Sequence, residues 1–110
     1  MGGLAVRVQE NRFRASQVCR ILGSPIACAL TILLLDSGPL TLSELVRHSR
    51  RSKQTTCYHL SRLRLAHLVR YETLGSETRY WIKYPDEVRR LVQALEGFVS
   101  RAARGLAEDA

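Results

Sequence analysis

The side chains best suited to chemistry in this chain are cationic and polar, and they gather in residues 45–71. This segment has no Asp or Glu, and it holds seven of the 17 Lys and Arg residues and all three His residues. The rest of the chain has ten basic and ten acidic residues, so the whole net charge of +7 belongs to these 27 residues. A basic stripe confined to one segment is typical of a nucleic-acid-binding surface, whereas an ordinary solvated face mixes both signs.

Side chains in this segment match the hydrogen-bonding groups of DNA. Gln54 is suited to pair with adenine and Lys53 with guanine, while Arg50 and Arg51 are suited to phosphates. Arg79, farther along the chain, is a candidate for the minor groove, or else a cross-strand partner of an acidic residue. The candidate DNA-contacting residues are Arg50, Arg51, Ser52, Lys53, Gln54, Thr55, Cys57, Tyr58, His59, Arg62 and Arg79.

Catalysis is not predicted. Cys57 and His59 are two positions apart on an expected helix, so they point about 200° apart and do not meet. The sequence has no second catalytic carboxylate, no Gly-rich phosphate loop and no metal-ligand spacing. We therefore expect neither an enzyme nor a bound cofactor.

Two short helices joined by a tight turn carry the basic segment. Thr41 and Glu44 form a capping box that starts a helix reaching about His48. Ser52 caps a second helix that reaches about Ala66, after a turn over residues 49–52. The second helix has an apolar inward face at positions 56, 60 and 63, and an outward face at positions 53, 54, 57 and 58. This is the helix-turn-helix arrangement, whose second helix enters the major groove.

The flanking elements complete a mainly α (α+β) fold with about five helices and a β-hairpin wing. We expect a helix from Asn11 to about residue 22, a central buried helix over residues 25–35, and strands over residues 68–73 and 78–84. A last helix starts at Pro85 and carries an apolar stripe longer than one small core needs. The first and last helices are expected to form a dimer interface through Phe13, Val88, Leu91, Leu95, Phe98 and Val99.

Length and composition fit a small cytoplasmic domain. The 110 residues suggest a flexible N-terminal arm over residues 1–9 and one domain over residues 10–107. The longest apolar run, residues 26–35, is too short to span a membrane. Three cysteines, an odd number, argue against a disulfide framework and suit a reducing compartment.

In order and type, these residues resemble the winged helix-turn-helix repressors of the ArsR family. The Ser-Pro helix start at Ser24, followed by the apolar residues 30–34, is similar to the family's opening pattern. Residues 52–60, SKQTTCYHL, resemble its Ser-x-x-Thr-Val-Ser-x-His-Leu helix, and residues 63–69, LRLAHLV, its Leu-Arg-x-Ala-Gly-Leu-Val. The wing ends in the aromatic strand RYW at residues 79–81. The resemblance implies a homodimeric repressor that binds double-stranded DNA at an inverted-repeat operator.

The chain also departs from the family pattern. Arg50 and Arg51 replace a Gly and an apolar residue in the turn, and His67 replaces a Gly after the second helix, so Arg50 and His67 are candidates for positive φ. Metal-sensing members carry cysteines in the first helix of the motif or Asp and His ligands in the last. Residues 42–48 have no Cys, and residues 88–98 have neither Cys nor His. No metal site is therefore expected.

The input signal stays open among a metal, thiol oxidation, a small molecule and none. Cys57 is the candidate for the most reactive thiol, because Lys53 and Arg51 lie near it and it stands close to a helix N-terminus. Cys19 and Cys28 flank a predicted corner. An oxidisable pair or a soft-metal site there is the alternative to the simpler interpretation of small buried apolar residues. The rival function is a winged-helix module that docks protein or RNA without reading DNA sequence.

Overall fold

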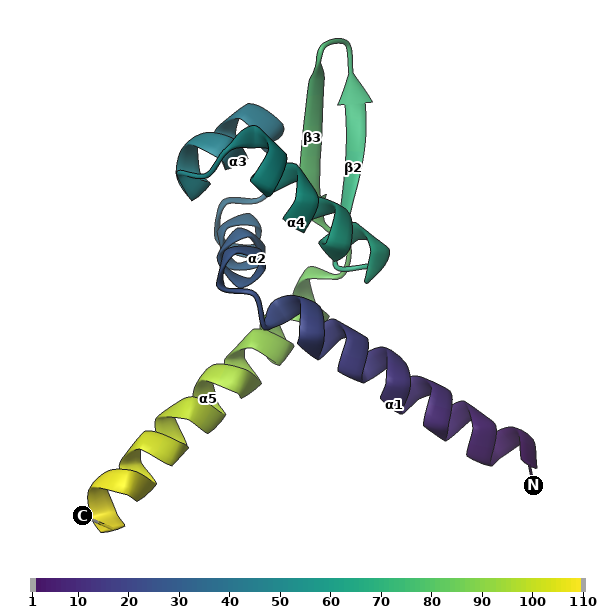
Figure 1. The fold of residues 1–110 in the computed structure, drawn as a ribbon, viewed down its shortest axis with the longest axis vertical. Coiled ribbons are helices and arrows are strands. Elements are labelled where there is room, and N and C mark those ends of the chain that lie inside the picture. The colour runs from purple at the N-terminus through teal and green to yellow at the C-terminus, as the bar shows by residue number, and fades with distance from the viewer. Residues whose placement is uncertain (1, 110) are drawn as a thin grey trace.

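The computed structural model describes the backbone of residues 2–109 and the side chains of residues 9–107. This part of the chain has five helices and a three-stranded antiparallel sheet, so the predicted mainly α fold with a winged helix-turn-helix is confirmed (Figure 1). The elements are α1 (Gly2–Leu22), α2 (Pro25–Ser37), β1 (Leu40–Thr41), α3 (Leu42–Ser49), α4 (Lys53–Leu65), β2 (Val69–Leu74), β3 (Glu77–Ile82) and α5 (Pro85–Asp109).

Helix α2 lies at the centre of the core, as predicted. Ser24 is its N-cap, the Ser24 hydroxyl accepts a hydrogen bond from the Ala27 N–H at 3.4 Å, and Pro25 opens the first turn. Leu30 and Leu34 are almost fully buried and belong to one core cluster with residues of α3, α4, the sheet and α5. Ala27 and Thr31 are buried too, so one face of α2 is closed by the other elements.

The pair α3 and α4 forms the helix-turn-helix. The capping box predicted for α3 is present: the Thr41 hydroxyl accepts from the Glu44 N–H at 3.2 Å, and the Glu44 carboxylate accepts from the Thr41 N–H at 3.0 Å. The inward face of α4 is as predicted, because Thr56, Leu60 and Leu63 are fully buried. The Thr56 hydroxyl lies 3.0 Å from that of Ser49, which ties α4 to the end of α3.

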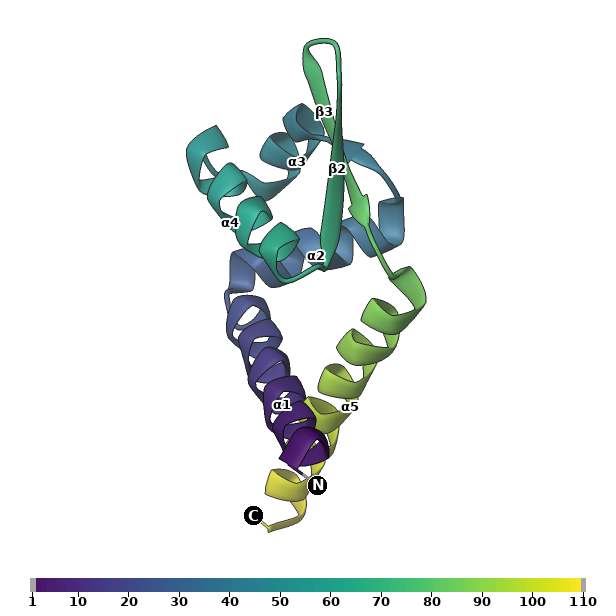
Figure 2. The ribbon, with the colours of Figure 1, turned by 90° about the vertical axis from the view of Figure 1, so that its right-hand side faces the viewer.

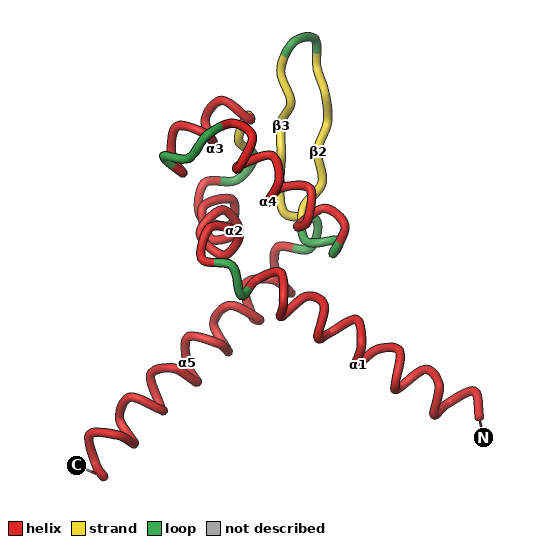
Figure 3. The backbone as a smooth tube through the Cα atoms, in the orientation of Figure 1, coloured by secondary structure: helices red, strands yellow, loops and turns green. Residues whose placement is uncertain are grey.

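The wing is a β2–β3 hairpin with a two-residue turn at Gly75 and Ser76. Gly75 takes a φ of 63° at the first turn position, which type II′ hairpins reserve for Gly. The sheet order is β1-β3-β2, with β1 paired to β3 at Leu40↔Tyr80 and Thr41↔Arg79. Strands β2 and β3 run side by side in Figure 3. Strand β1 was not predicted, because two residues give no alternating pattern and the same residues carry the capping signal of α3.

Helices α1 and α5 leave the core in different directions and splay apart below it in the view of Figure 1. The view of Figure 2 shows both helices extending below α2. Ile21 and Leu22, at the end of α1, and Val88 and Val92, at the start of α5, are buried. Beyond these turns the apolar side chains reach solvent. The exposed members are Phe13 at 63%, Leu95 at 47%, Phe98 at 73%, Val99 at 65% and Leu106 at 74%.

The start of α1 differs from the prediction. A helix beginning at Asn11 was expected, after a flexible arm over residues 1–9, but the structure continues the helix back to Gly2, and residue 1 lies outside the described residues. Asn11 is therefore an exposed residue within the helix and not its N-cap. Residues 4–10 contain neither Pro nor Gly, so no helix breaker precedes Asn11 in this stretch.

Within residues 2–109, no single helix has the length and apolar character needed to cross a membrane. By length and composition alone, α1 from Gln9 together with α2 meets that requirement as a pair, with a bend of 93° between the two helices.

Candidate nucleic-acid interface

The turn between α3 and α4 is built to expose two arginines. Arg50 adopts a left-handed conformation with φ of 56°, and its N–H donates to the Val46 carbonyl at 3.2 Å, which closes α3. The Arg51 N–H donates to the Ser49 hydroxyl at 3.2 Å. Both arginine side chains are exposed. His67 is the other residue that takes a positive φ where the family pattern has Gly, at 62°.

The N-terminal turn of α4 presents polar side chains outward. Ser52 is the N-cap, and its hydroxyl accepts from the Thr55 N–H at 3.0 Å and donates to the Thr55 hydroxyl at 3.0 Å. Lys53 and Gln54 are exposed, and Tyr58 is 57% exposed one turn later. Lys53, Gln54 and Tyr58 thus share the surface that the sequence assigned to the outward face, whereas Thr55 is half-buried and takes part in the cap.

Cys57 does not share that open face. It is half-buried and lines a cleft of about 280 Å³ between α4 and the wing, together with Tyr71, Thr78 and Tyr80. Burial, followed by the neighbouring Cys57 and Tyr71, raises the pKa of the Tyr80 phenol. The outward position predicted for Cys57 is therefore wrong, because the wing packs over this flank of α4.

His59 and Arg62 lie on the opposite flank of α4. His59 is half-buried, and its Nδ1 lies 3.4 Å from the Ser24 hydroxyl at the corner between α1 and α2. The Arg62 guanidinium lies over the Tyr58 ring, 5.8 Å from its centroid. Cys57 and His59 face different neighbours, in agreement with the predicted separation of thiol and imidazole.

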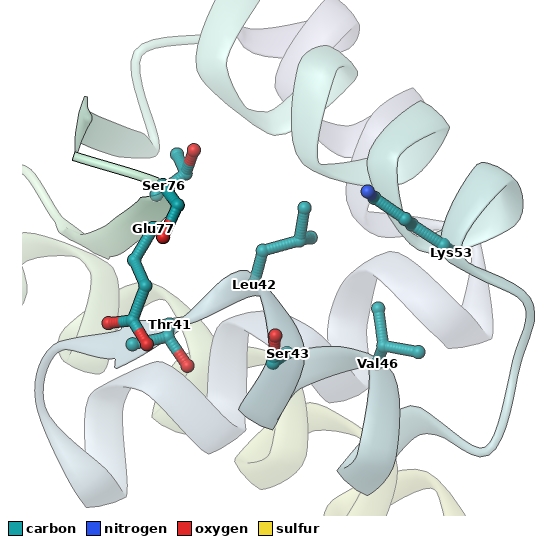
Figure 4. A pocket seen from close by; sticks show the side chains of 8 residues that line it. Thr41, Leu42, Ser43, Val46, Lys53, Ser76 and Glu77 are labelled. Carbon is teal, nitrogen blue, oxygen red and sulfur yellow. The ribbon is translucent and has the colours of Figure 1, made fainter. Parts of the chain in front are cut away.

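The tip of the wing and the start of α4 enclose a second cleft, of about 360 Å³ (Figure 4). Leu42 lies between the two walls, and the Lys53 ammonium group points toward the cleft from α4. Ser76 and Glu77 form the wing side, and Thr41 lies at its base. Thr41, Ser76 and Glu77 are not among the site residues predicted from the sequence, since only the fold brings the wing turn opposite the start of α4.

Arg79 lies on β3, two residues beyond the hairpin end of that strand. It is exposed and stands directly across from Glu72 on β2 and from Thr41 on β1. Both predicted alternatives thus remain compatible with its position: it faces solvent beside the wing tip, and it has an acidic cross-strand neighbour. The salt bridges found among the described residues do not include an Arg79–Glu72 pair.

The other two cysteines flank the corner between α1 and α2. The corner bends by 93°, so the two helices do not form an antiparallel hairpin there. Cys19 is exposed and Cys28 half-buried, and both are free thiols. The interpretation as small buried apolar residues is therefore wrong for Cys19. Within the described residues, no group of three or more His, Cys, Asp or Glu side chains is placed to hold a metal ion.

Solved structures share this fold. HlyU from Vibrio cholerae superposes with a TM-score of 0.70 at 22% identity, covering 80% of this chain and 94% of HlyU. The transcriptional repressor BigR from Xylella fastidiosa gives a TM-score of 0.71 at 18% identity, with 86% and 94% covered. A homodimeric winged helix-turn-helix DNA-binding domain from Mycobacterium bovis, a possible ArsR-family regulator, gives 0.73 at 19% identity, with 83% and 85% covered.

The chain therefore has the winged helix-turn-helix fold, which it shares with these solved structures and which the sequence resemblance predicted. No protein-family model matches the sequence, and no curated protein matches it.

Proposed function

We propose that this protein is a sequence-specific DNA-binding transcriptional repressor that acts as a homodimer on an inverted-repeat operator. One observation carries the proposal: residues 45–71, which hold the entire net positive charge, include most of α3, the turn after it and all of α4. The turn and the first turn of α4 expose three cations and an amide with no acidic residue among them. This is the electrostatic and geometric pattern of a major-groove reader.

In this proposal the exposed residues divide by chemistry. Gln54 and Lys53 read base edges, with Tyr58 beside them, because they lie on the outward N-terminal part of α4. Arg50 and Arg51 bind phosphates from the turn, where the N-terminus of α4 adds its partial positive charge. Arg79 approaches the minor groove from the wing.

The homodimer is supported by the apolar residues left uncovered on α1 and α5. Leu95, Phe98 and Val99 continue the stripe that Val88 and Val92 begin in the core, and they are exposed. Soluble monomers rarely leave such a contiguous apolar surface open. A two-fold partner would cover the stripe on both copies at once, and it would present two α4 helices to successive major grooves. The homodimeric state of the similar Mycobacterium bovis domain supports this arrangement.

The rival function is a winged-helix module that docks protein or RNA without reading DNA sequence. Selection of random double-stranded DNA by the purified protein, followed by sequencing of the retained fragments, separates the two. We expect a palindromic motif with half-sites about one helical turn apart. Retained fragments without a common motif would refute the repressor proposal and favour the rival.

We also propose that oxidation of Cys57 releases the DNA. The support is its position: Cys57 is half-buried in the cleft between α4 and the wing, beside Tyr71 and Tyr80. Oxygen atoms or a bulky adduct on this sulfur would add bulk and polarity between α4 and the wing, where both must approach the DNA.

A mild thiol oxidant is expected to release operator DNA from the wild type but not from Cys57→Ser, measured by fluorescence anisotropy. Cys19→Ser and Cys28→Ser serve as controls and should respond like the wild type. Equal release from the Cys57→Ser protein would contradict a role for this thiol.

A further inference from the structure

Helix α2 carries a groove on the side that faces away from the core. The groove is also separate from the proposed dimer interface. Its floor comes from α2, chiefly Ile26, Ala29 and Leu33, and its rim comes from His48 and Arg51 at the end of α3 and the following turn. The groove has a volume of about 390 Å³. Ala29 is exposed, while Ile26 and Leu33 are half-buried. The central helix of the fold thus leaves an apolar strip open to solvent.

The rim of this groove is cationic and polar. Arg51 is permanently charged, His48 offers a ring N–H, and no Asp or Glu lines the groove. None of the salt bridges of the described residues involves Arg51 or His48, although His48 lies near enough to the Glu44 carboxylate to interact with it electrostatically. The Ser49 hydroxyl between them is already engaged, 3.0 Å from the Thr56 hydroxyl and 3.1 Å from the Val46 carbonyl. A guanidinium and an imidazole N–H beside an apolar floor are complementary to an anion that carries an apolar body.

We propose that this groove binds a small organic anion, a carboxylate with an aliphatic or aromatic body, and that the bound anion competes with DNA for Arg51. The volume lies within the range of roughly 300–1,000 Å³ that small-molecule sites have. The apolar body lies on Ile26, Ala29 and Leu33, and the carboxylate accepts hydrogen bonds from Arg51 and His48. The second half of the proposal rests on the proposed function, because Arg51 is there a phosphate-binding residue.

The coupling follows from geometry. Arg51 belongs both to the groove rim and to the exposed turn that precedes α4. A guanidinium that holds a carboxylate in the groove is no longer free for a DNA phosphate, so the same side chain serves one anion or the other. The bound anion is therefore an inducer that weakens DNA binding without moving any helix.

The test uses two probes, 8-anilinonaphthalene-1-sulfonate, which fluoresces in apolar sites, and decanoate as its competitor. With the full-length protein we expect saturable fluorescence that decanoate displaces. Ala29→Trp fills the groove floor and should weaken both probes about tenfold or more. His48→Ala, a milder change at an exposed residue, should weaken decanoate about threefold or more. Gln93→Trp places the same ring at an exposed position of α5 outside the stripe and should leave both affinities unchanged.

DNA binding is measured separately, by anisotropy of a labelled duplex. Decanoate should lower the DNA affinity of the wild type and of Gln93→Trp, but not that of Ala29→Trp. Unchanged probe binding in Ala29→Trp and His48→Ala would overturn the site. Conversion of Ala29→Trp to monomers in sedimentation would also overturn it, because a second copy would then cover the groove. Decanoate binding without any effect on DNA affinity would overturn the competition. A wild type that never binds DNA would instead refute the proposed function, and the proposed anion site would still stand on the probe binding.

Discussion

Gln54 and Arg51 lie three residues apart but offer DNA different chemistry. The side-chain amide of Gln54 has a donor and an acceptor in one plane, which match the major-groove edge of adenine. Arg51 precedes the helix and carries a full charge in the exposed turn, a position suited to the phosphate backbone. Base readout depends on the sequence of the DNA, whereas phosphate binding does not.

Truncation of these two side chains is expected to separate specificity from affinity. Gln54→Ala should lower the preference at one operator base pair by about 1–3 kcal/mol, with little loss on random DNA. Arg51→Ala should weaken operator and random DNA alike and reduce the salt slope by about one. Arg90→Ala removes an exposed arginine that is paired with Glu87 on α5 and serves as the control. Equal losses on both DNAs for Gln54→Ala would refute its assignment to base readout.

Helical periodicity predicted the faces of α4 but not the neighbours of its flanks. The inward residues Thr56, Leu60 and Leu63 and the outward residues Lys53 and Gln54 follow from the 100° turn per residue. Residues on the flanks, Cys57 and His59 among them, depend on what lies beside the helix. The wing covers one flank and the α1–α2 corner approaches the other, and both contacts join residues far apart in the sequence.

Among the elements, α3 follows an N-cap residue, Thr41, that is held by both a capping box and a strand pairing. Thr41 caps α3 and is also the β1 residue opposite Arg79, so one residue fixes both the helix and the wing. Thr41→Ala should destabilise the fold by about 1 kcal/mol, seen in urea denaturation as a lower midpoint with an unchanged slope. Ser43→Ala, at an exposed position in the first turn, is the control and should change the midpoint much less.

The capping box also gives a pH dependence of known sign. A hydrogen bond from the Thr41 backbone, and then one from its side chain, lower the pKa of the Glu44 carboxyl. A lowered folded-state pKa means that Glu44 stabilises the fold at neutral pH, and that this contribution is lost as pH falls through the usual carboxyl range and below. The difference in Tm between the wild type and Glu44→Gln should therefore shrink on acidification. A difference that stays constant from pH 7 to acid would contradict the ionised cap.

Helix α5 changes its environment along its length. Its first turns are buried through Val88 and Val92, and the same stripe continues into solvent at Leu95 and Phe98. Leu95→Glu places a charge in the middle of the proposed dimer interface and should give monomers in light scattering, which should lose operator binding. Gln93→Glu adds the same charge outside the stripe and should stay dimeric. A wild type that is monomeric at tens of micromolar would refute the dimer.

The boundaries of the elements were predictable where a cap or a breaker marks them. Ser24 with Pro25, Thr41 with Glu44, and Ser52 each start a helix in the structure as predicted. The start predicted at Asn11 was wrong. Asn is common at N-caps but also occurs inside helices, and no Pro or Gly directly before Asn11 interrupts α1. Strand β1 was missed because its two residues carry no strand pattern of their own, and only their pairing with β3 defines them as a strand.

At the scale of the whole molecule, two chemically different ends lie on either side of α2. The basic α3–α4 pair and the wing occupy one end, and the splayed helices α1 and α5 with their exposed apolar residues extend from the other (Figures 1 and 2). A partner that covers the apolar end leaves the basic end free. The arrangement therefore separates the surface proposed for dimerisation from the one proposed for DNA.

The charge distribution makes DNA binding the central claim, and its dependence on salt is the most direct test. Seven cations per chain in residues 45–71 suffice for a dimer to neutralise about 6–10 phosphates. The affinity for a labelled duplex, followed by anisotropy, should then fall roughly 10³–10⁵-fold between about 50 and 200 mM salt. A steep fall of this size is what we expect. An affinity that is unchanged across this range would contradict the assignment of the basic helix-turn-helix to DNA.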